Sequence, residues 1–176
     1  MTETLPATRS LAGVTIRAYR PADHNACRGL WAELTQHRSA IAALSSEPDD
    51  GAGFEEYLTQ LNLSGMWVAE HGGQVAGFIG LMLDGRAGEV DPIVVTEPMR
   101  GKGIGRALLA KVAEEARRRG LHRLTISPPV GDVTALRTLH SSGFATLATV
   151  TLSFDLGRRQ RGQGGSIDLY DLRFAT

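Results

Sequence analysis

VDPIVVTEPMRGKGIGRALLAKVAEEARRRG, residues 90–120, is the stretch that decides the fold. Its β-branched run at 93–95 lies between Pro92 and Pro98 and suits a strand that is buried on both faces. A glycine-rich loop follows, and an amphipathic pattern with apolar residues three and four apart comes after the loop. Residues 90–120 therefore predict a strand, a glycine loop and a helix, in that order.

The glycine loop has the composition of a phosphate-binding cradle. Glycines let the backbone approach a ligand closely and adopt positive φ, so that successive N–H groups converge on one anion. Unpaired N–H groups and the dipole at the start of the following helix favour phosphate as well. Three glycines and three basic residues lie close together at this point: Arg100, Gly101, Lys102, Gly103, Gly105 and Arg106. We therefore expect the loop to bind a diphosphate.

Two other phosphate loops fit this stretch less well. A Walker loop needs a hydroxyl residue after Gly-Lys, whereas Gly103 follows Gly101-Lys102. A dinucleotide fingerprint needs a third glycine, where Arg106 or Leu108 stands, and an acid after the next strand. A bare Gly-x-Gly is often only a turn, so the cradle depends on its flanking strand, helix and bases.

Arg100-x-x-Gly103-x-Gly105 resembles the Gln/Arg-x-x-Gly-x-Gly/Ala signature of the GNAT superfamily of acetyl-CoA-dependent N-acetyltransferases. The resemblance covers residues 14–174. It implies that the loop amides hold the pyrophosphate of coenzyme A and that the pantetheine arm pairs with the preceding strand. The cofactor-binding residues expected on this basis are Ile93, Val94, Val95, Arg100, Gly101, Lys102, Gly103, Ile104, Gly105 and Arg106.

Length and composition permit one compact domain and are compatible with a reducing compartment. The chain has 176 residues, of which 42% are hydrophobic, and 19 basic residues balance 19 acidic ones. This balance gives no overall electrostatic case for nucleic acid or an anionic membrane. A single cysteine, Cys27, excludes an intrachain disulfide and a multi-cysteine metal site, and the apolar run 75–83 is far shorter than the roughly 20 residues that span a bilayer. We expect a cytoplasmic protein without metal, nucleic acid or membrane partners, and leave a homodimer open.

The rest of the chain fits an α/β domain, residues 14–176, after a loose tail, residues 1–13. The resemblance implies a mixed, mainly antiparallel sheet of six or seven strands flanked by about four helices. We expect strands at 14–19, 66–70, 74–83, around 89–95, 121–127, 149–156 and 166–174. Helices are expected at 21–36, 54–61, 104–119 and 132–140, with a basic loop at 157–165.

A second family pattern is Asn-x-x-Ala-x-x-x-Tyr-x-x-x-Gly-Phe, which this chain matches at Ala135, Gly143 and Phe144. Asp132 and Leu139 stand at its Asn and Tyr positions. The family's Tyr is often the proton donor to the departing thiolate, a role that an aliphatic side chain cannot perform. His140 lies about 100° further around the helix and replaces the Tyr only if the helix end is offset there.

An acid on the central strand, Glu89 or Asp91, is the candidate acceptor of the proton from the attacking ammonium. The two acids are two residues apart and are expected to share a face with Ile93 and Val95. An equally good interpretation is that Glu89 and Asp91 are simply two exposed charges at the start of a strand. His24, His37 and Arg38 are interpreted as solvated helix residues.

The predicted activity is acetyl transfer from acetyl-CoA to a primary amine of a small molecule, and an acid cluster at 47–50 would attract a cationic amine. The alternatives are a catalytically silent module that binds acyl-CoA or RNA, and a peptide or protein N-acetyltransferase. The basic loop 157–165 lacks the interleaved aromatic residues of an RNA-binding surface, which favours a solvated hairpin tip.

Overall fold

The computed structural model describes residues 13–41, 51–61, 65–152 and 165–175. Residues 1–12 of the predicted tail, the acid cluster 47–50 and nearly all of the basic loop lie outside the described residues. The elements are β1 (Val14–Ala18), η1 (Pro21–Asp23), α1 (His24–Ile41), α2 (Gly53–Gln60), β2 (Met66–His71), β3 (Gln74–Asp84), β4 (Ala87–Val95), η3 (Glu97–Met99), α3 (Ile104–Arg118), β5 (Arg123–Thr125), α4 (Val133–Ser141), β6 (Ser166–Leu169) and β7 (Leu172–Ala175).

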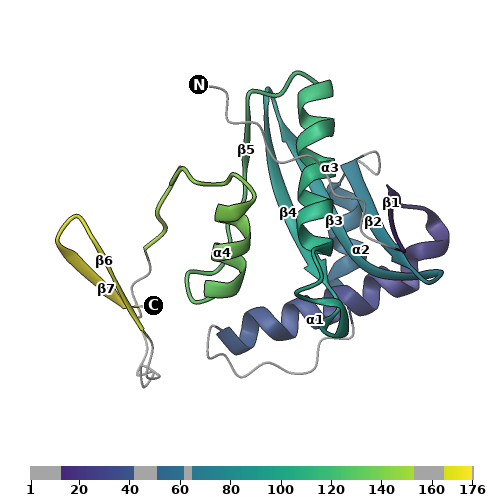
Figure 1. Cartoon of the computed structure of the whole chain (residues 1–176), viewed down its shortest axis with the longest axis horizontal. Coiled ribbons are helices and arrows are strands. Elements are labelled where there is room, and N and C mark those ends of the chain that lie inside the picture. The colour runs from purple at the N-terminus through teal and green to yellow at the C-terminus, as the bar shows by residue number, and fades with distance from the viewer. Residues whose placement is uncertain (1–12, 42–50, 62–64, 153–164, 176) are drawn as a thin grey trace.

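The main sheet has five strands in the order β1-β2-β3-β4-β5. The first four are antiparallel neighbours, while β5 runs parallel to β4 because α3 carries the chain back across the sheet (Figure 1). Gly72 and Gly73, both at positive φ, close the β2–β3 hairpin as the sequence predicts. The α/β class and the mixed, mainly antiparallel sheet are confirmed.

Helices cover both faces of this sheet and enclose two apolar clusters. α3 lies along one face (Figure 1), where Leu108 and Val112 pack with Ile79 and Leu81 of β3. α1 and α2 cover the other face in a cluster that contains Leu30, Phe54, Tyr57, Met66 and Phe78. Within the described ranges, no helix is both long enough and apolar enough to cross a bilayer.

The C-terminal part differs from the predicted arrangement. The expected strand 166–174 is divided into β6 and β7 by Tyr170 and Asp171, whose φ values are 52° and 62°. Two successive residues at positive φ make a tight hairpin turn, and Asp tolerates this conformation because its short polar side chain bonds locally. The described residues therefore hold seven strands in sheets of five and two, and residues 149–152 belong to neither. α1 also extends beyond the predicted end near Gln36.

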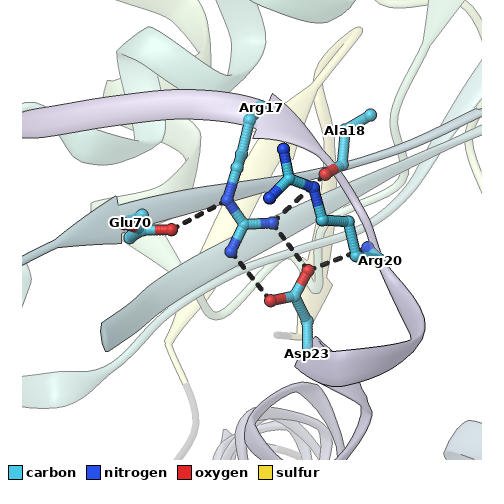
Figure 2. A network of polar contacts seen from close by, with 5 residues as sticks. All are labelled: Arg17, Ala18, Arg20, Asp23 and Glu70. Carbon is cyan, nitrogen blue, oxygen red and sulfur yellow. Dashed lines mark hydrogen bonds and ion pairs between the residues drawn. The ribbon is translucent and has the colours of Figure 1, made fainter. Parts of the chain in front are cut away.

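An ion-pair network fastens the start of α1 to the sheet (Figure 2). Arg17 on β1 donates to both carboxylate oxygens of Asp23, at 2.7 and 2.8 Å, and to Glu70 on β2 at 2.8 Å. Asp23, which is buried, also accepts from the backbone N–H of Arg20 at 2.8 Å. The Arg17 hydrogen bonds lower the pKa of Asp23 below its ordinary value. This network fixes where α1 crosses the sheet.

Candidate active site

The glycine loop brings a helix N-terminus to the end of β4. Gly101 and Gly103 adopt φ values of 75° and 88°, a region that favours glycine, and Gly103 is the N-cap of α3. The first helical hydrogen bond runs from the N–H of Ala107 to Gly103 O at 3.1 Å. The amides of residues 104–106 precede this bond and have no partner within the helix. The predicted cradle is therefore present as backbone geometry.

The basic residues of the loop differ in how they are held. Arg100 donates to Val95 O at 2.9 Å, which ties its guanidinium to the end of β4. Lys102 and Arg106 are exposed, whereas the side chain of Ile104 is buried in the core. At position 104 only the backbone is therefore suited to contact a ligand.

β4 has an edge that is open along most of its length. Within the described chain, β5 pairs with β4 only where Arg123–Thr125 lie beside Ala87–Glu89. Pro92 on β4 and Pro128-Pro129 after β5 have no N–H to contribute to a longer ladder. Figure 1 shows the chain leaving β5 toward α4. We call residues 90–95 on this side the open edge of β4.

A bulge in β4 changes the face of the sheet on which Glu89 and Asp91 lie relative to Ile93 and Val95. Ile79 lies opposite Ile93 and Leu81 opposite Val90, so two steps on β3 face three steps on β4. The extra residue reverses the alternation, and Val90 and Ile93 both pack in the α3 cluster. The expectation that Glu89 and Asp91 share a face with Ile93 and Val95 is therefore wrong.

The two acids lie on the α1 side of the sheet. Glu89 is exposed and pairs with Met82, which packs against the α1 and α2 cluster. The Asp91 carboxylate contacts Arg38 of α1 at 3.1 Å. Their predicted role in proton transfer stays a prediction.

Tyr57 reaches the bulge from α2, which sequence reasoning missed. Its hydroxyl donates to Asp91 O at 2.9 Å. Gly80 makes room for this contact, because a Cβ at position 80 would lie 1.8 Å from the Tyr57 oxygen. Burial raises the pKa of Tyr57, so the hydroxyl keeps its proton and remains a donor. A glycine inside the strand pattern was the available signal for this close approach.

The end of α1 contacts β4 at the bulge and also contacts the start of α4. Arg38 binds Asp91 at the bulge, and His37 Nε2 lies 3.0 Å from Asp132 Oδ2. Asp132 is also the N-cap of α4, where its Oδ1 accepts from Ala135 N at 2.9 Å. His37 and Arg38 are partly exposed, as expected of solvated helix residues, but each is also held by a carboxylate from another element.

α4 gives no support to His140 as a substitute for the family's Tyr. Leu139 is buried in the α3 cluster, while His140 is exposed at the next position of the same helix. Both residues lie within α4, so they remain about 100° apart. The offset that His140 would need is not found.

A four-stranded antiparallel sheet that continues through a glycine-led helix into a parallel fifth strand is consistent with the fold of the N-acetyltransferase class of α/β proteins. The chain belongs to the acetyltransferase (GNAT) family, whose model matches residues 27–144. This match runs from α1 past the end of α4 and includes the cradle, the bulge and the open edge of β4.

Relatives with curated functions share this family. The chain is 28% identical over 158 residues to the mycothiol acetyltransferase of Thermobispora bispora, covering 82% of this chain and 50% of the relative. It thus spans about half the length of that protein. The L-methionine sulfoximine/L-methionine sulfone acetyltransferase of Salmonella typhimurium is 29% identical over 140 residues, which are 77% of this chain and 82% of the relative.

Solved structures show the same fold. The ribosomal-protein-alanine N-acetyltransferase of Brucella melitensis is 28% identical, with a TM-score of 0.58 over 73% of this chain and 83% of that one. A protein of Salmonella typhimurium solved with acetyl-CoA as its cofactor is 25% identical, with a TM-score of 0.58 over 74% and 79% of the two chains.

Proposed function

We propose that the protein transfers an acetyl group from acetyl-CoA to a primary amine of a small molecule. The observation that carries this proposal is the glycine-led N-terminus of α3, placed at the end of a strand whose edge is open. Amides 104–106 and the basic residues around them suit a pyrophosphate. The Cβ position of Gly105 lies 4.0 Å from the side chains of Ile93 and Val95, so the cradle adjoins the open edge.

The pantetheine arm would follow the open edge from Val95 toward Asp91. Its amides can pair with a free strand edge in the way that extended peptides do. The four residue steps from Val95 to Asp91 span roughly 13 Å of strand. This path would bring the thioester to the bulge, where Tyr57 and Asp91 meet.

The acceptor would then approach from the α1 and α2 side of the sheet. Two acids lie on that side, Glu89 and Asp91, and they favour a cationic amine. The Salmonella relative named for methionine sulfoximine and sulfone supports a small acceptor, while the Brucella structure named for a ribosomal protein supports a protein acceptor. We favour the small amine because of the local acids. The cytoplasmic location and the homodimer stay predictions.

The departing group would be the coenzyme A thiolate. Leu139 is aliphatic and buried, so it cannot protonate the sulfur. An ordinary thiol has a pKa of about 8.5, which makes its thiolate a tolerable leaving group that water can protonate. The missing Tyr therefore lowers the expected rate without preventing the reaction.

The test combines binding with turnover. Gly103→Val should weaken acetyl-CoA binding by about tenfold or more, equivalent to about 1.4 kcal/mol, in calorimetric titration. Gly120→Val is the matched control, because Gly120 also has positive φ, at 69°, but lies just beyond the other end of α3. Equal affinities of wild type and Gly103→Val would refute the cradle.

Thiol release is then measured with acetyl-CoA and a panel of amines, polyamines, amino acids, aminoglycosides and basic peptides. Turnover on a small amine is the expected result. Turnover on peptides alone would refute the small acceptor, and tight binding without any turnover would favour the silent module.

A further inference from the structure

We propose that His37, in place of Glu89 or Asp91, accepts the proton of the attacking ammonium and that Asp132 positions the imidazole for this step. The inference rests on the proposed function and deepens it by naming the base. His37 comes from the last turns of α1, and Asp132 from the start of α4, 95 positions later in the sequence.

The carboxylate determines which ring nitrogen is basic. An ionised carboxylate only accepts hydrogen bonds, so His37 Nε2, at 3.0 Å from Asp132 Oδ2, must carry the proton. The neutral imidazole then has its lone pair on Nδ1. Among the residues that the structure describes, no group is hydrogen-bonded to Nδ1. The ring is thus held in the tautomer whose basic nitrogen is Nδ1, the nitrogen that faces away from Asp132.

Asp132 is itself fixed in place. Its second oxygen accepts from Ala135 N at 2.9 Å, so the carboxylate is locked as the cap of α4. Its side chain is 17% exposed, while the His37 side chain is 40% exposed. A base must be reachable by substrate and its partner must be rigid, and the pair meets both conditions.

The segment of α1 that carries His37 also contacts the expected reaction centre. The residue next to His37, Arg38, contacts Asp91 at the bulge, where the thioester would lie. One turn earlier on α1, Glu33 accepts from Thr96 just beyond the end of β4, at 3.0 Å. The charged groups around His37 are therefore Asp132 on α4, Arg38 and Glu33 on α1, and Asp91 on β4.

The proposed step moves two protons and one acetyl group. The ammonium gives one proton to His37 Nδ1, and the nitrogen lone pair attacks the thioester carbonyl carbon. The C–S bond breaks, and its electron pair leaves with sulfur as the thiolate. The second proton, which the nitrogen loses as the amide forms, passes through water to the thiolate. His37 returns its proton to solvent.

The chain offers a matched control on the same helix. His24 makes a similar contact with a carboxylate, from its Nε2 to Glu55 Oε1 at 3.1 Å. It lies 13 positions earlier in α1, which is about 20 Å along the axis. A general loss of helix contacts would affect His24→Gln and His37→Gln alike, but a loss of base catalysis would affect only the latter.

The experiment measures kcat/KM against pH with the acceptor amine identified in the panel. His37→Gln should lower kcat/KM at neutral pH by about 10²-fold or more. This loss should shrink as pH approaches the pKa of the amine, since free amine then needs no base. Acetyl-CoA affinity should stay within about twofold, and His24→Gln should match wild type.

Asp132→Asn is the second variant, since Asn keeps the capping oxygen but no longer requires a proton on Nε2. We expect it to lower kcat/KM and to shift the ¹⁵N imidazole signals of His37 away from the Nε2–H tautomer in the wild-type spectrum. A wild-type spectrum with the proton on Nδ1 would overturn the inference, whichever variants fold.

The kinetic outcomes separate the two proposals. Wild type that acetylates an amine, while His37→Gln keeps its rate and pH profile, overturns the role of His37 and leaves the proposed function intact. Wild type that binds acetyl-CoA but releases no thiol with any acceptor overturns the proposed function, and the inference with it.

Discussion

Gly80→Ala tests the contact between Tyr57 and the bulge most directly. The new methyl group would lie 1.8 Å from the Tyr57 oxygen and 2.6 Å from Asp91 O. Real carbon atoms do not approach so closely, so α2 or the bulge must shift. Overpacking of this kind costs about 1–3 kcal/mol of unfolding free energy.

A double-mutant cycle with Tyr57→Phe separates the two close contacts. Tyr57→Phe alone removes the hydrogen bond to Asp91 O, a loss of about 0.5–1.5 kcal/mol. In the double variant the new methyl group no longer meets the phenol oxygen, although it still meets Asp91 O. The double variant should therefore be more stable than the sum of the single changes by about 1 kcal/mol.

Urea unfolding followed by circular dichroism measures these differences. Gly29→Ala is the control, because Gly29 lies in α1 with nothing within 4 Å of an added Cβ. A helix-interior glycine replaced by alanine should stabilise by about 0.5–1 kcal/mol. Strict additivity of Gly80→Ala and Tyr57→Phe, or a stabilising Gly80→Ala, would refute the packing argument.

Three further predictions concern other parts of the fold. Because pairing with Arg17 lowers the pKa of Asp23, its carboxylate stabilises the fold above the unfolded value of about 3.9, and this contribution is lost as pH falls through the lower folded value. Asp23→Asn should therefore lower the unfolding free energy at pH 7 by about 1.5–3 kcal/mol, with a difference from wild type that disappears in strong acid. Burial raises the pKa of the Cys27 thiol to about 12, so a thiol reagent at pH 8 should label it only as the protein unfolds; rapid labelling of folded protein would contradict this. Asp171→Gly should relieve the positive φ of 62° and slow hydrogen exchange of the β6 and β7 amides, whereas faster exchange would argue against the turn.

The sequence was sufficient for the elements whose signals are local. The run 93–95, the glycines at 101 and 103 and the apolar stripe of α3 each specify their own backbone conformation, and the structure confirms strand, loop and helix. The β2–β3 hairpin followed from Gly72-Gly73 in the same way. These features could be predicted because they depend on residues close in sequence.

The face of the sheet on which Glu89 and Asp91 lie, and the contacts that α1 makes, could not be predicted from local patterns. The bulge depends on how β4 pairs with β3, and one extra residue there reverses the face of Glu89 and Asp91. His37 meets Asp132 across 95 positions, a contact that no local pattern encodes. In the C-terminal region, Leu169 and Leu172 resemble one continuous strand, and this hid the turn between them.

The short ladder between β4 and β5 has a consequence for the dynamics of the protein. In the described chain, β5 and α4 are held against the rest of the fold by three register pairs with β4, by the packing of Leu139 and its apolar neighbours in the α3 cluster, and by the His37–Asp132 contact. Segments with few such contacts open locally at lower free energy than the core. If the coenzyme of the proposed function binds only the form in which β5 and α4 are closed against β4, it adds about 2.7 kcal/mol to closure at 100 times its Kd. Binding of the coenzyme and closure of β5 and α4 against β4 are then thermodynamically coupled, so each favours the other.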